Sequence, residues 1–256
     1  MFSQDRACLK IHSHHLHAPL RGRFGPNSLN VARYAALIWA KSTTKWDAQL
    51  TESNFQTHPR PEGADRMRKF YEVVEANPVI AAVKDEEGLE MCCSMEEMKV
   101  IFVLFGDICS IPGIVKRIKD AGKTALVHID LITGLSAKEA AVDYIRSNTS
   151  ADGILSTKPL MIQRAKELSM YTVLRFFVID SMAIKSIENL DRQRGGKPDF
   201  IEVMPGVMPK VISRICRSSR IPVIAGGLIA DKEDVMGALE AGAMAVSSTD
   251  QSVWEL

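Results

Sequence analysis

Several features of common protein classes are missing from this 256-residue sequence. It has no apolar run approaching the roughly 18 residues of a transmembrane helix. Residues 1–30 contain four Lys/Arg but no continuous apolar core of a secretory signal. The five cysteines are odd in number and form no CxxC pair. The sequence therefore predicts a cytoplasmic protein with reduced thiols.

A strong net charge is missing as well. The formal charge is +1, with nine Lys/Arg against five Asp/Glu in residues 1–66, and 23 against 26 in residues 67–256. The larger part therefore gives no global electrostatic argument for nucleic-acid binding. No aromatic-rich RNA motif accompanies its basic clusters.

Residues 1–66 differ in composition from the rest of the chain. They hold five of the six histidines and two of the three tryptophans, and only 30–40 reads as a short helix. We expect this extension to be disordered or the product of a misassigned start, with Met67 as the natural one. His12, His14, His15 and Cys8 could ligate a metal, but no second ligand group stands at structural-zinc spacing, so no metal site is predicted.

Residues 67–256 alternate short apolar runs with amphipathic stretches. The runs have the length of strands buried on both faces, as in a parallel sheet. The expected strands are 78–83, 100–105, 124–130, 153–157, 171–179, 200–204, 221–225 and 243–249. The expected helices are a lead-in at 67–77, then 86–98, 111–121, 136–147 with Ser136 and Glu139 as a capping box, one opening at Pro159, 181–194, 209–218, 232–241 and a last turn at 251–256.

This alternation predicts an α/β fold, a (β/α)8 TIM-type barrel over 67–256 with a shortened last helix. A flavodoxin-like open sheet is the competing fold, but it needs about five such units.

The stretch 221–249 shows the unit most clearly. A buried strand is followed by Gly226 and Gly227, then by a helix with Asp231 as its N-cap and Gly242 just after its end, and then by a strand that ends in hydroxyls. Loops after the last two strands of such barrels often bind phosphate. We therefore predict a phosphate site, the alternative being a tight Gly-Gly turn that only connects two elements. The predicted site comprises Gly206, Gly226, Gly227, Ser248 and Thr249.

Polar side chains at other strand ends form a second group, because active groups of this fold lie at the C-terminal ends of strands. His128 and Asp130 are two apart on one predicted strand, so both should face the same way. One interpretation is an internal ionic network that specifies packing; the other is a set of groups that contact a polar ligand beside the phosphate. The predicted ligand-binding residues are Asp107, His128, Asp130, Lys158, Arg175 and Glu202.

Five segments stand in an order that resembles a known family: HIDLITGL (128–135), GILSTK (153–158), RFFVIDS (175–181), DFIEVMPG (199–206) and IPVIAGGLI (221–229). From about residue 79 to 254 the chain is similar to the glycerol-3-phosphate-responsive antiterminators. The resemblance implies a ligand-gated regulator without a catalytic residue, metal or cofactor. Its effector would be glycerol 3-phosphate, and its partner the leader mRNA of glycerol-utilisation operons.

The RNA-binding surface is less distinct in the sequence. Lys210, Arg214 and Arg217 recur at helical spacing on 209–218, and Lys116 and Lys119 lie on 111–121. Either cluster could contact phosphates, or could be a solvated helix face. The sequence does not determine the oligomeric state.

An enzyme is the alternative function, because the same barrel serves isomerases, synthases and lyases that act on phosphorylated metabolites. His128 and Asp130 would then be an acid/base pair, with Glu202 as a second carboxylate and Lys158 as a nucleophilic amine. The strand at 200–204 lacks a lysine for a Schiff base.

Overall fold

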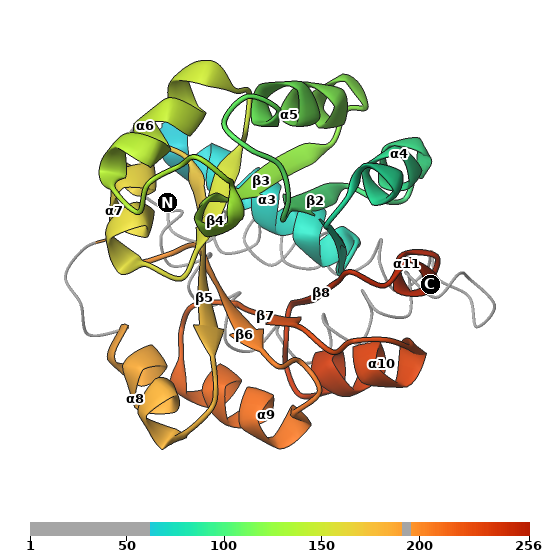
Figure 1. Ribbon diagram of the computed structural model, residues 1–256. Coiled ribbons are helices and arrows are strands. Elements are labelled where there is room, and N and C mark those ends of the chain that lie inside the picture. The colour runs from blue at the N-terminus through green and yellow to red at the C-terminus, as the bar shows by residue number, and fades with distance from the viewer. Residues whose placement is uncertain (1–61, 191–195) are drawn as a thin grey trace, which may run out of the picture.

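The computed structural model describes residues 62–190 and 196–256, and its strands close into a parallel barrel. Each strand pairs with the next in the chain, and the last pairs with the first (Figure 1). The strands are β1 Val79–Val83, β2 Val100–Val103, β3 Thr124–His128, β4 Gly153–Ser156, β5 Tyr171–Phe177, β6 Phe200–Met204, β7 Val223–Gly226 and β8 Ala245–Ser248. The predicted (β/α)8 barrel is confirmed.

Helices between the strands cover the outside of the barrel (Figure 1). They are α4 Glu86–Ser94, α5 Ile111–Asp120, α6 Glu139–Asn148, α7 Pro159–Glu167, α8 Ser181–Leu190, α9 Pro209–Ser218, α10 Lys232–Glu240 and α11 Gln251–Trp254. The predicted N-cap of α10 is confirmed, since the Asp231 side chain accepts from the amide of Asp234. Gly242 follows that helix with a φ of +105°, in the backbone region that favours glycine.

Alternate residues of each strand face two different cores. Outward residues such as Ile101, Val127 and Val203 pack against the helices. Inward residues such as Phe102, Leu126 and Phe200 form a second cluster within the barrel. The period of two residues along a strand therefore determines which side chains enter the interior.

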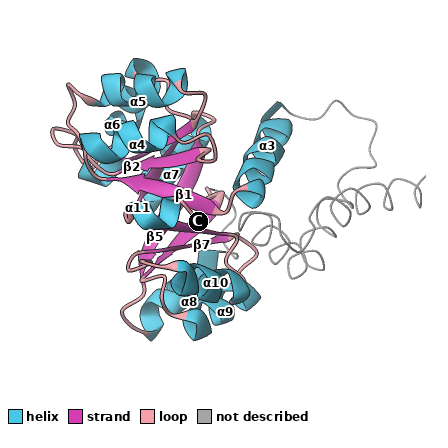
Figure 2. Ribbon diagram, turned by 90° about the vertical axis from the view of Figure 1, so that its right-hand side faces the viewer, coloured by secondary structure: helices cyan, strands magenta, loops and turns pink. Residues whose placement is uncertain are grey.

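Helix α3, Glu62–Ala76, closes the N-terminal end of the barrel (Figure 2). Phe70 stacks on Tyr171, the first residue of β5, with ring centroids 4.2 Å apart, and meets the edge of Phe200, the first residue of β6, at 5.3 Å. The strands terminate at the opposite end, which we call the mouth of the barrel.

Sequence reasoning placed most strand ends within two residues, but several details were wrong. Helix α3 begins at Glu62, five residues before the expected 67. Strand β3 ends at His128 and continues as a 3-10 turn, η1 Ile129–Leu131, so Asp130 is not on the strand. Helix α6 begins at Glu139 after Lys138, which makes no side-chain cap, so the Ser136 capping box was also wrong.

Other predictions lie outside the described residues. These are the helix at 30–40, the extension at 1–61 and the last residues of the helix expected at 181–194. Among the described residues, no helix is long and apolar enough to cross a membrane. The four described cysteines, Cys92, Cys93, Cys109 and Cys216, are free thiols.

Candidate ligand site at the barrel mouth

A buried ion pair lies inside the barrel near the mouth. Arg175 of β5 and Glu202 of β6 are register partners, and both face inward because they lie two residues beyond the inward Val173 and Phe200. Arg175 Nε donates to Glu202 Oε2 at 2.5 Å. Ser247 Oγ of β8 donates to the other carboxylate oxygen at 2.6 Å. Both oxygens of a fully buried carboxylate are thus satisfied, which buried charges require.

The arginine has hydrogen-bonding capacity left over. Only its Nε has a hydrogen-bond acceptor among the described residues. An unpaired Nη atom that was fully enclosed would count as a buried polar atom without a partner, and within the described residues neither Nη atom does. Both Nη atoms therefore reach solvent-accessible space. Glu202 therefore fixes the guanidinium while two N–H-bearing groups remain directed at whatever occupies the mouth.

His128, the last residue of β3, belongs to the same interior layer because it is two residues beyond the inward Leu126. Its side chain is buried, and Nδ1 has no hydrogen-bond partner among the described residues. Burial, and secondarily the positive charge of Arg175, lowers the pKa of His128 to about 4. The imidazole is therefore neutral at physiological pH, with Nδ1 enclosed and Nε2 facing accessible space.

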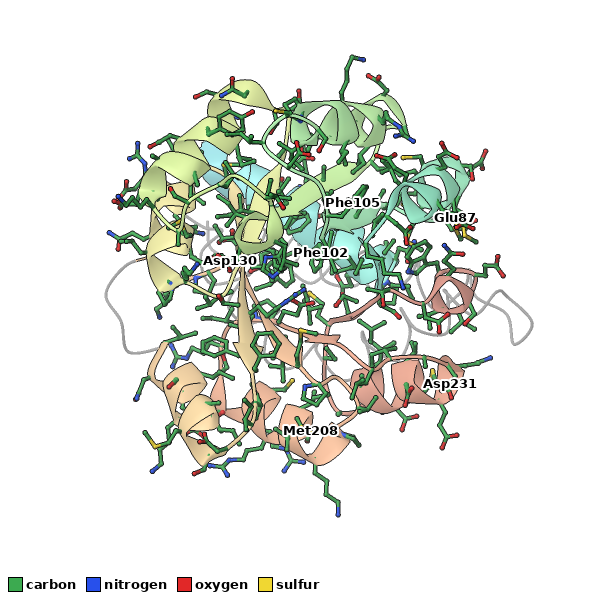
Figure 3. The ribbon with its side chains drawn as sticks, viewed as in Figure 1. Glu87, Phe102, Phe105, Asp130, Met208 and Asp231 are labelled. Atoms are coloured by element: carbon green, nitrogen blue, oxygen red, sulfur yellow. The ribbon has the colours of Figure 1, made fainter. Side chains whose placement is uncertain are left out.

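Asp130 is held by the neighbouring β4–α7 loop. Its carboxylate accepts from the Thr157 amide at 2.7 Å, from the Thr157 and Ser156 hydroxyls at 2.9 and 3.0 Å, and from Lys158 Nζ at 3.3 Å. Burial alone would raise the pKa of Asp130, but these donors together outweigh burial and lower it. Figure 3 shows Asp130 toward the centre of the barrel, whereas Glu87 and Asp231 lie at its periphery.

This arrangement corrects the expected pairing of His128 with Asp130. A 3-10 turn does not continue the alternation of a strand, so the two side chains do not share a strand face. Among the described residues, no hydrogen bond joins them. Asp130 and Lys158 instead tie the end of β3 to the start of α7.

Asp107 does not join the mouth group. Its carboxylate accepts from the amides of Cys109 at 2.7 Å and Ser110 at 2.8 Å, at the start of α5. These amides, with the Ser110 amide making the largest contribution, lower the pKa of Asp107. The Ser110 hydroxyl in turn accepts from the amide of Asp107 at 2.9 Å. We therefore assign Asp107 to the local turn that opens this helix.

The glycines predicted to bind phosphate lie together, with different roles. A Cβ on Gly226 would stand 2.5 Å from Ser247 Oγ and 2.6 Å from Glu202 Oε1, so the buried ion pair requires glycine there. The amide of Gly206 donates to the Gly227 carbonyl at 2.9 Å, which joins the β6–α9 loop to the β7–α10 loop. Because this amide is already occupied, Gly206 shapes the site and is not a free donor.

The β7–α10 loop itself has the geometry of an anion site. Gly227 and Leu228 have φ angles of +76° and +63°, two successive left-handed residues. Among the described residues, the amides of Leu228 and Ile229 find no hydrogen-bond acceptor, whereas the parallel pairing of Gly226 with Ser247 directs the Gly227 amide at the Ser247 carbonyl. Successive free amides in such a turn form a concavity that suits an anion.

The hydroxyls after β8 divide into two kinds. Ser248 Oγ donates to the Ile229 carbonyl at 2.6 Å and accepts from the Asp250 amide at 3.0 Å, so its proton is used to hold the loops. Thr249 is exposed at the end of the strand. Ser247 was missed by sequence reasoning, although its position two residues beyond Ala245 places it on the inward face.

The two basic helices differ in their surroundings. On α5, Lys116 pairs with Asp120 at 2.5 Å, and Lys119 donates to Asp152 at 2.6 Å. On α9, Lys210, Arg214 and Arg217 line a groove of about 690 Å³ against α10. Within 62–190 and 196–256, no group of three or more His, Cys, Asp or Glu side chains could hold a metal ion.

Comparison with known proteins gives a consistent assignment for most of the chain. Residues 79–254 match the family described as glycerol-3-phosphate responsive antiterminator. Residues 9–64 match a family of unknown function, DUF6783, which says nothing about their role. An uncharacterized Escherichia coli K12 protein, YgcP, is 44% identical over 185 residues, covering 72% of this chain and 95% of that protein.

Two solved structures are also similar. The glycerol uptake operon antiterminator regulatory protein of Listeria monocytogenes is 31% identical with a TM-score of 0.65, over 69% of this chain and 94% of that one. A glycerol uptake operon antiterminator-related protein of Thermotoga maritima is 32% identical with a TM-score of 0.61, over 70% and 98% of the two chains.

Proposed function

Because the chain belongs to the glycerol-3-phosphate-responsive antiterminator family, we propose that it binds glycerol 3-phosphate at the barrel mouth and then acts on leader mRNA. Its site of action would be the cytoplasm, where these transcripts are made. The observation that carries the proposal is Arg175, buried and fixed through Nε by Glu202, with both Nη atoms unpaired beside a neutral histidine.

The phosphate group has two sources of donors in this proposal. The unpaired amides of Leu228 and Ile229 lie on one side of the anion, and the Nη atoms of Arg175 provide a charge-assisted pair from the barrel interior. Arginine suits this task because its planar donors match a tetrahedral oxyanion in pairs. The Glu202 carboxylate keeps the guanidinium oriented before the ligand arrives, which reduces the ordering cost of binding.

The hydroxyls of the ligand need neutral partners. His128 is uncharged at neutral pH, and its Nε2, unlike the enclosed Nδ1, reaches accessible space without a partner among the described residues, so a ligand hydroxyl can bind it. A polar site built to hydrogen-bond a hydroxyl discriminates strongly against analogues that lack it. The glycerol part of glycerol 3-phosphate offers alcohol hydroxyls beyond the phosphate group, and inorganic phosphate does not.

The geometry favours regulation over the enzymatic alternative. An acid/base pair of His128 and Asp130 would need a hydrogen bond between them or a shared reacting atom. The Asp130 carboxylate is instead occupied by Ser156, Thr157 and Lys158. Lys158, the candidate nucleophile, is engaged in the ion pair with Asp130.

Thermal unfolding with small ligands tests the ligand half of this proposal. A ligand that binds only the native state adds RT ln(1 + [L]/Kd), about 2.7 kcal/mol at about 100 times Kd. We expect a rise in Tm with glycerol 3-phosphate, a smaller one with inorganic phosphate, and none with glycerol. Equal rises with glycerol and glycerol 3-phosphate would rule out a phosphate-directed site. Readthrough of a leader terminator, with and without glycerol 3-phosphate, tests the regulatory half.

A further inference from the structure

Helices α9 and α10 lie side by side on the outside of the barrel (Figures 1 and 2), and residues of both line one groove. Three cations of one helix line it, at the spacing of four and three residues that places side chains on one face. Glu240 is the single acidic residue among those that line it. The remaining lining residues are small or uncharged: Pro209, Ser213, Gly237 and Ala241.

Charge accessibility distinguishes this groove from the basic face of α5. Arg117 of α5 donates to Glu86 at 2.5 Å and lies 3.6 Å from Glu90, and Lys116 is paired with Asp120. On α9, Lys210 is exposed and has no ion-pair partner among the described residues. Arg214 has a loose contact of 3.6 Å with Glu188 and is more than half exposed. A polyanion can therefore approach Lys210 and Arg214 without displacing close carboxylates.

Both walls of the groove are connected to the ligand site. Helix α9 follows the β6–α9 loop that contains Gly206, and α10 follows the β7–α10 loop that contains Gly227. The hydrogen bond from the Gly206 amide to the Gly227 carbonyl joins these loops. A ligand that contacts the amides of the second loop thus acts on the same backbone that sets the spacing of the two helices.

We propose that the α9–α10 groove binds the sugar-phosphate backbone of single-stranded RNA, with Lys210 and Arg214 as its main phosphate contacts. Ligand binding at the joined loops sets the width of the groove. This assignment rests on the proposed antiterminator function and identifies its RNA surface. Small residues at the base of the groove let the RNA backbone approach closely, and the contacts carry no sequence preference of their own.

Charge reversal tests the assignment on the full chain, with a labelled oligouridine as the probe and fluorescence anisotropy as the readout. The variant Lys210→Glu with Arg214→Glu removes two cations and adds two anions in the groove. The matched control, Lys116→Glu with Arg117→Glu on α5, changes the net charge equally. We expect at least about tenfold weaker binding for the α9 pair and less than about threefold for the α5 pair. Each lost phosphate contact should also reduce the slope of log K against log salt by about 0.7.

Gly237 provides a second test that leaves the cations in place. A Cβ at this position of α10 would meet no atom within 4 Å, so substitutions there are sterically tolerated. Gly237→Glu places a carboxylate in the groove and should weaken oligouridine binding by at least about fivefold. Gly237→Ala, its neutral control, should bind within about twofold of the unaltered protein.

The two measurements test the RNA-binding groove and the ligand site independently. All variants should retain the rise in Tm with glycerol 3-phosphate, because none of them alters the mouth. Absence of oligouridine binding at low salt, or equal loss in the α5 and α9 variants, would overturn the groove assignment while leaving ligand binding intact. A missing Tm response in the unaltered protein would count against the proposed function, and the anisotropy data would still decide the groove.

Discussion

Arg175 and Glu202 neutralise each other's charge in the barrel interior, where their side chains are 7% and 0% exposed. Removing one member of such a pair leaves the other buried and uncompensated. We predict that Arg175→Met lowers the free energy of unfolding by about 3–5 kcal/mol in urea titrations. Arg175→Met with Glu202→Gln should recover at least half of that loss, because Gln is neutral. A double variant as unstable as the single one would show that the pair is not coupled.

His128 predicts a pH dependence with a definite sign. Its pKa falls from 6.5 in the unfolded chain to about 4 in the fold, so the unfolded state binds more protons between these values. Its contribution to stability is complete above about pH 6.5, declines as the pH falls toward about 4, and is constant below. The full difference corresponds to about 3 kcal/mol.

The measurement is the free energy of unfolding of the unaltered protein and of His128→Asn between pH 4 and pH 7, with a non-titrating amide in place of the imidazole. The variant should lose less stability on acidification across this window. Parallel curves for the two proteins would contradict a depressed pKa. Asp130 does not interfere, because its pKa is lowered below the usual value of 3.8 and its contribution is lost below this window.

At the scale of single elements, the space around each glycine determines whether a larger residue is tolerated there. Gly237 lies within helix α10 with open space around its missing Cβ, whereas a Cβ on Gly153 of β4 would stand 2.4 Å from the Tyr171 carbonyl. We predict that Gly237→Ala raises the free energy of unfolding by about 0.5–1 kcal/mol, since alanine loses less backbone entropy in a helix. Gly153→Ala should lower it clearly. Thermal unfolding of both variants checks the prediction, and a destabilised Gly237→Ala would contradict it.

The sequence predicted elements better than the contacts between them. Apolar runs such as 100–103 and 200–204 specify strands by length and burial alone, and Asp231 and Gly242 mark the ends of α10 through local hydrogen bonds and backbone angles. Arg175 and Glu202 stood out as charged residues within apolar runs, and the alternation along β5 and β6 accounts for their inward position. These features depend on residues close together in the chain.

The predictions failed where residues far apart in the sequence determine the local conformation or the hydrogen-bond partner of a side chain. Asp130 leaves the strand pattern because the β4–α7 loop provides four donors for its carboxylate, and nothing near it in the chain shows this. The partners of side chains were equally hidden: the Ser248 hydroxyl donates to the Ile229 carbonyl, and Lys119 lies beside Asp152. The predicted roles of Ser248 in phosphate binding and of Lys119 in RNA binding stay predictions.

At the scale of the whole molecule, α3 is the first described element and covers one end of the barrel. Phe70 is buried against Tyr171 and Phe200, so removing the helix would expose the end of the barrel core. We predict that a chain starting at Glu62 keeps the Tm and ligand response of the full chain. A chain starting at Val79 should aggregate or lose several kcal/mol, since truncating one buried aromatic costs about 3–5 kcal/mol. Loss of folding or ligand binding in the chain from Glu62 would instead give residues 1–61 a role.

The central claim is that a phosphate group lies beside Gly227, against the free amides of Leu228 and Ile229. Gly227→Asp and Gly227→Asn test it most directly, because they share a shape and the same strain at a φ of +76° and differ in charge. Like charges about 4 Å apart repel by about 1 kcal/mol in water and about 4 at an effective dielectric of 20. Isothermal titration with glycerol 3-phosphate should give a Kd at least about tenfold weaker for Asp than for Asn, a difference of about 1.4 kcal/mol. Equal Kd values in two folded variants would place the phosphate elsewhere.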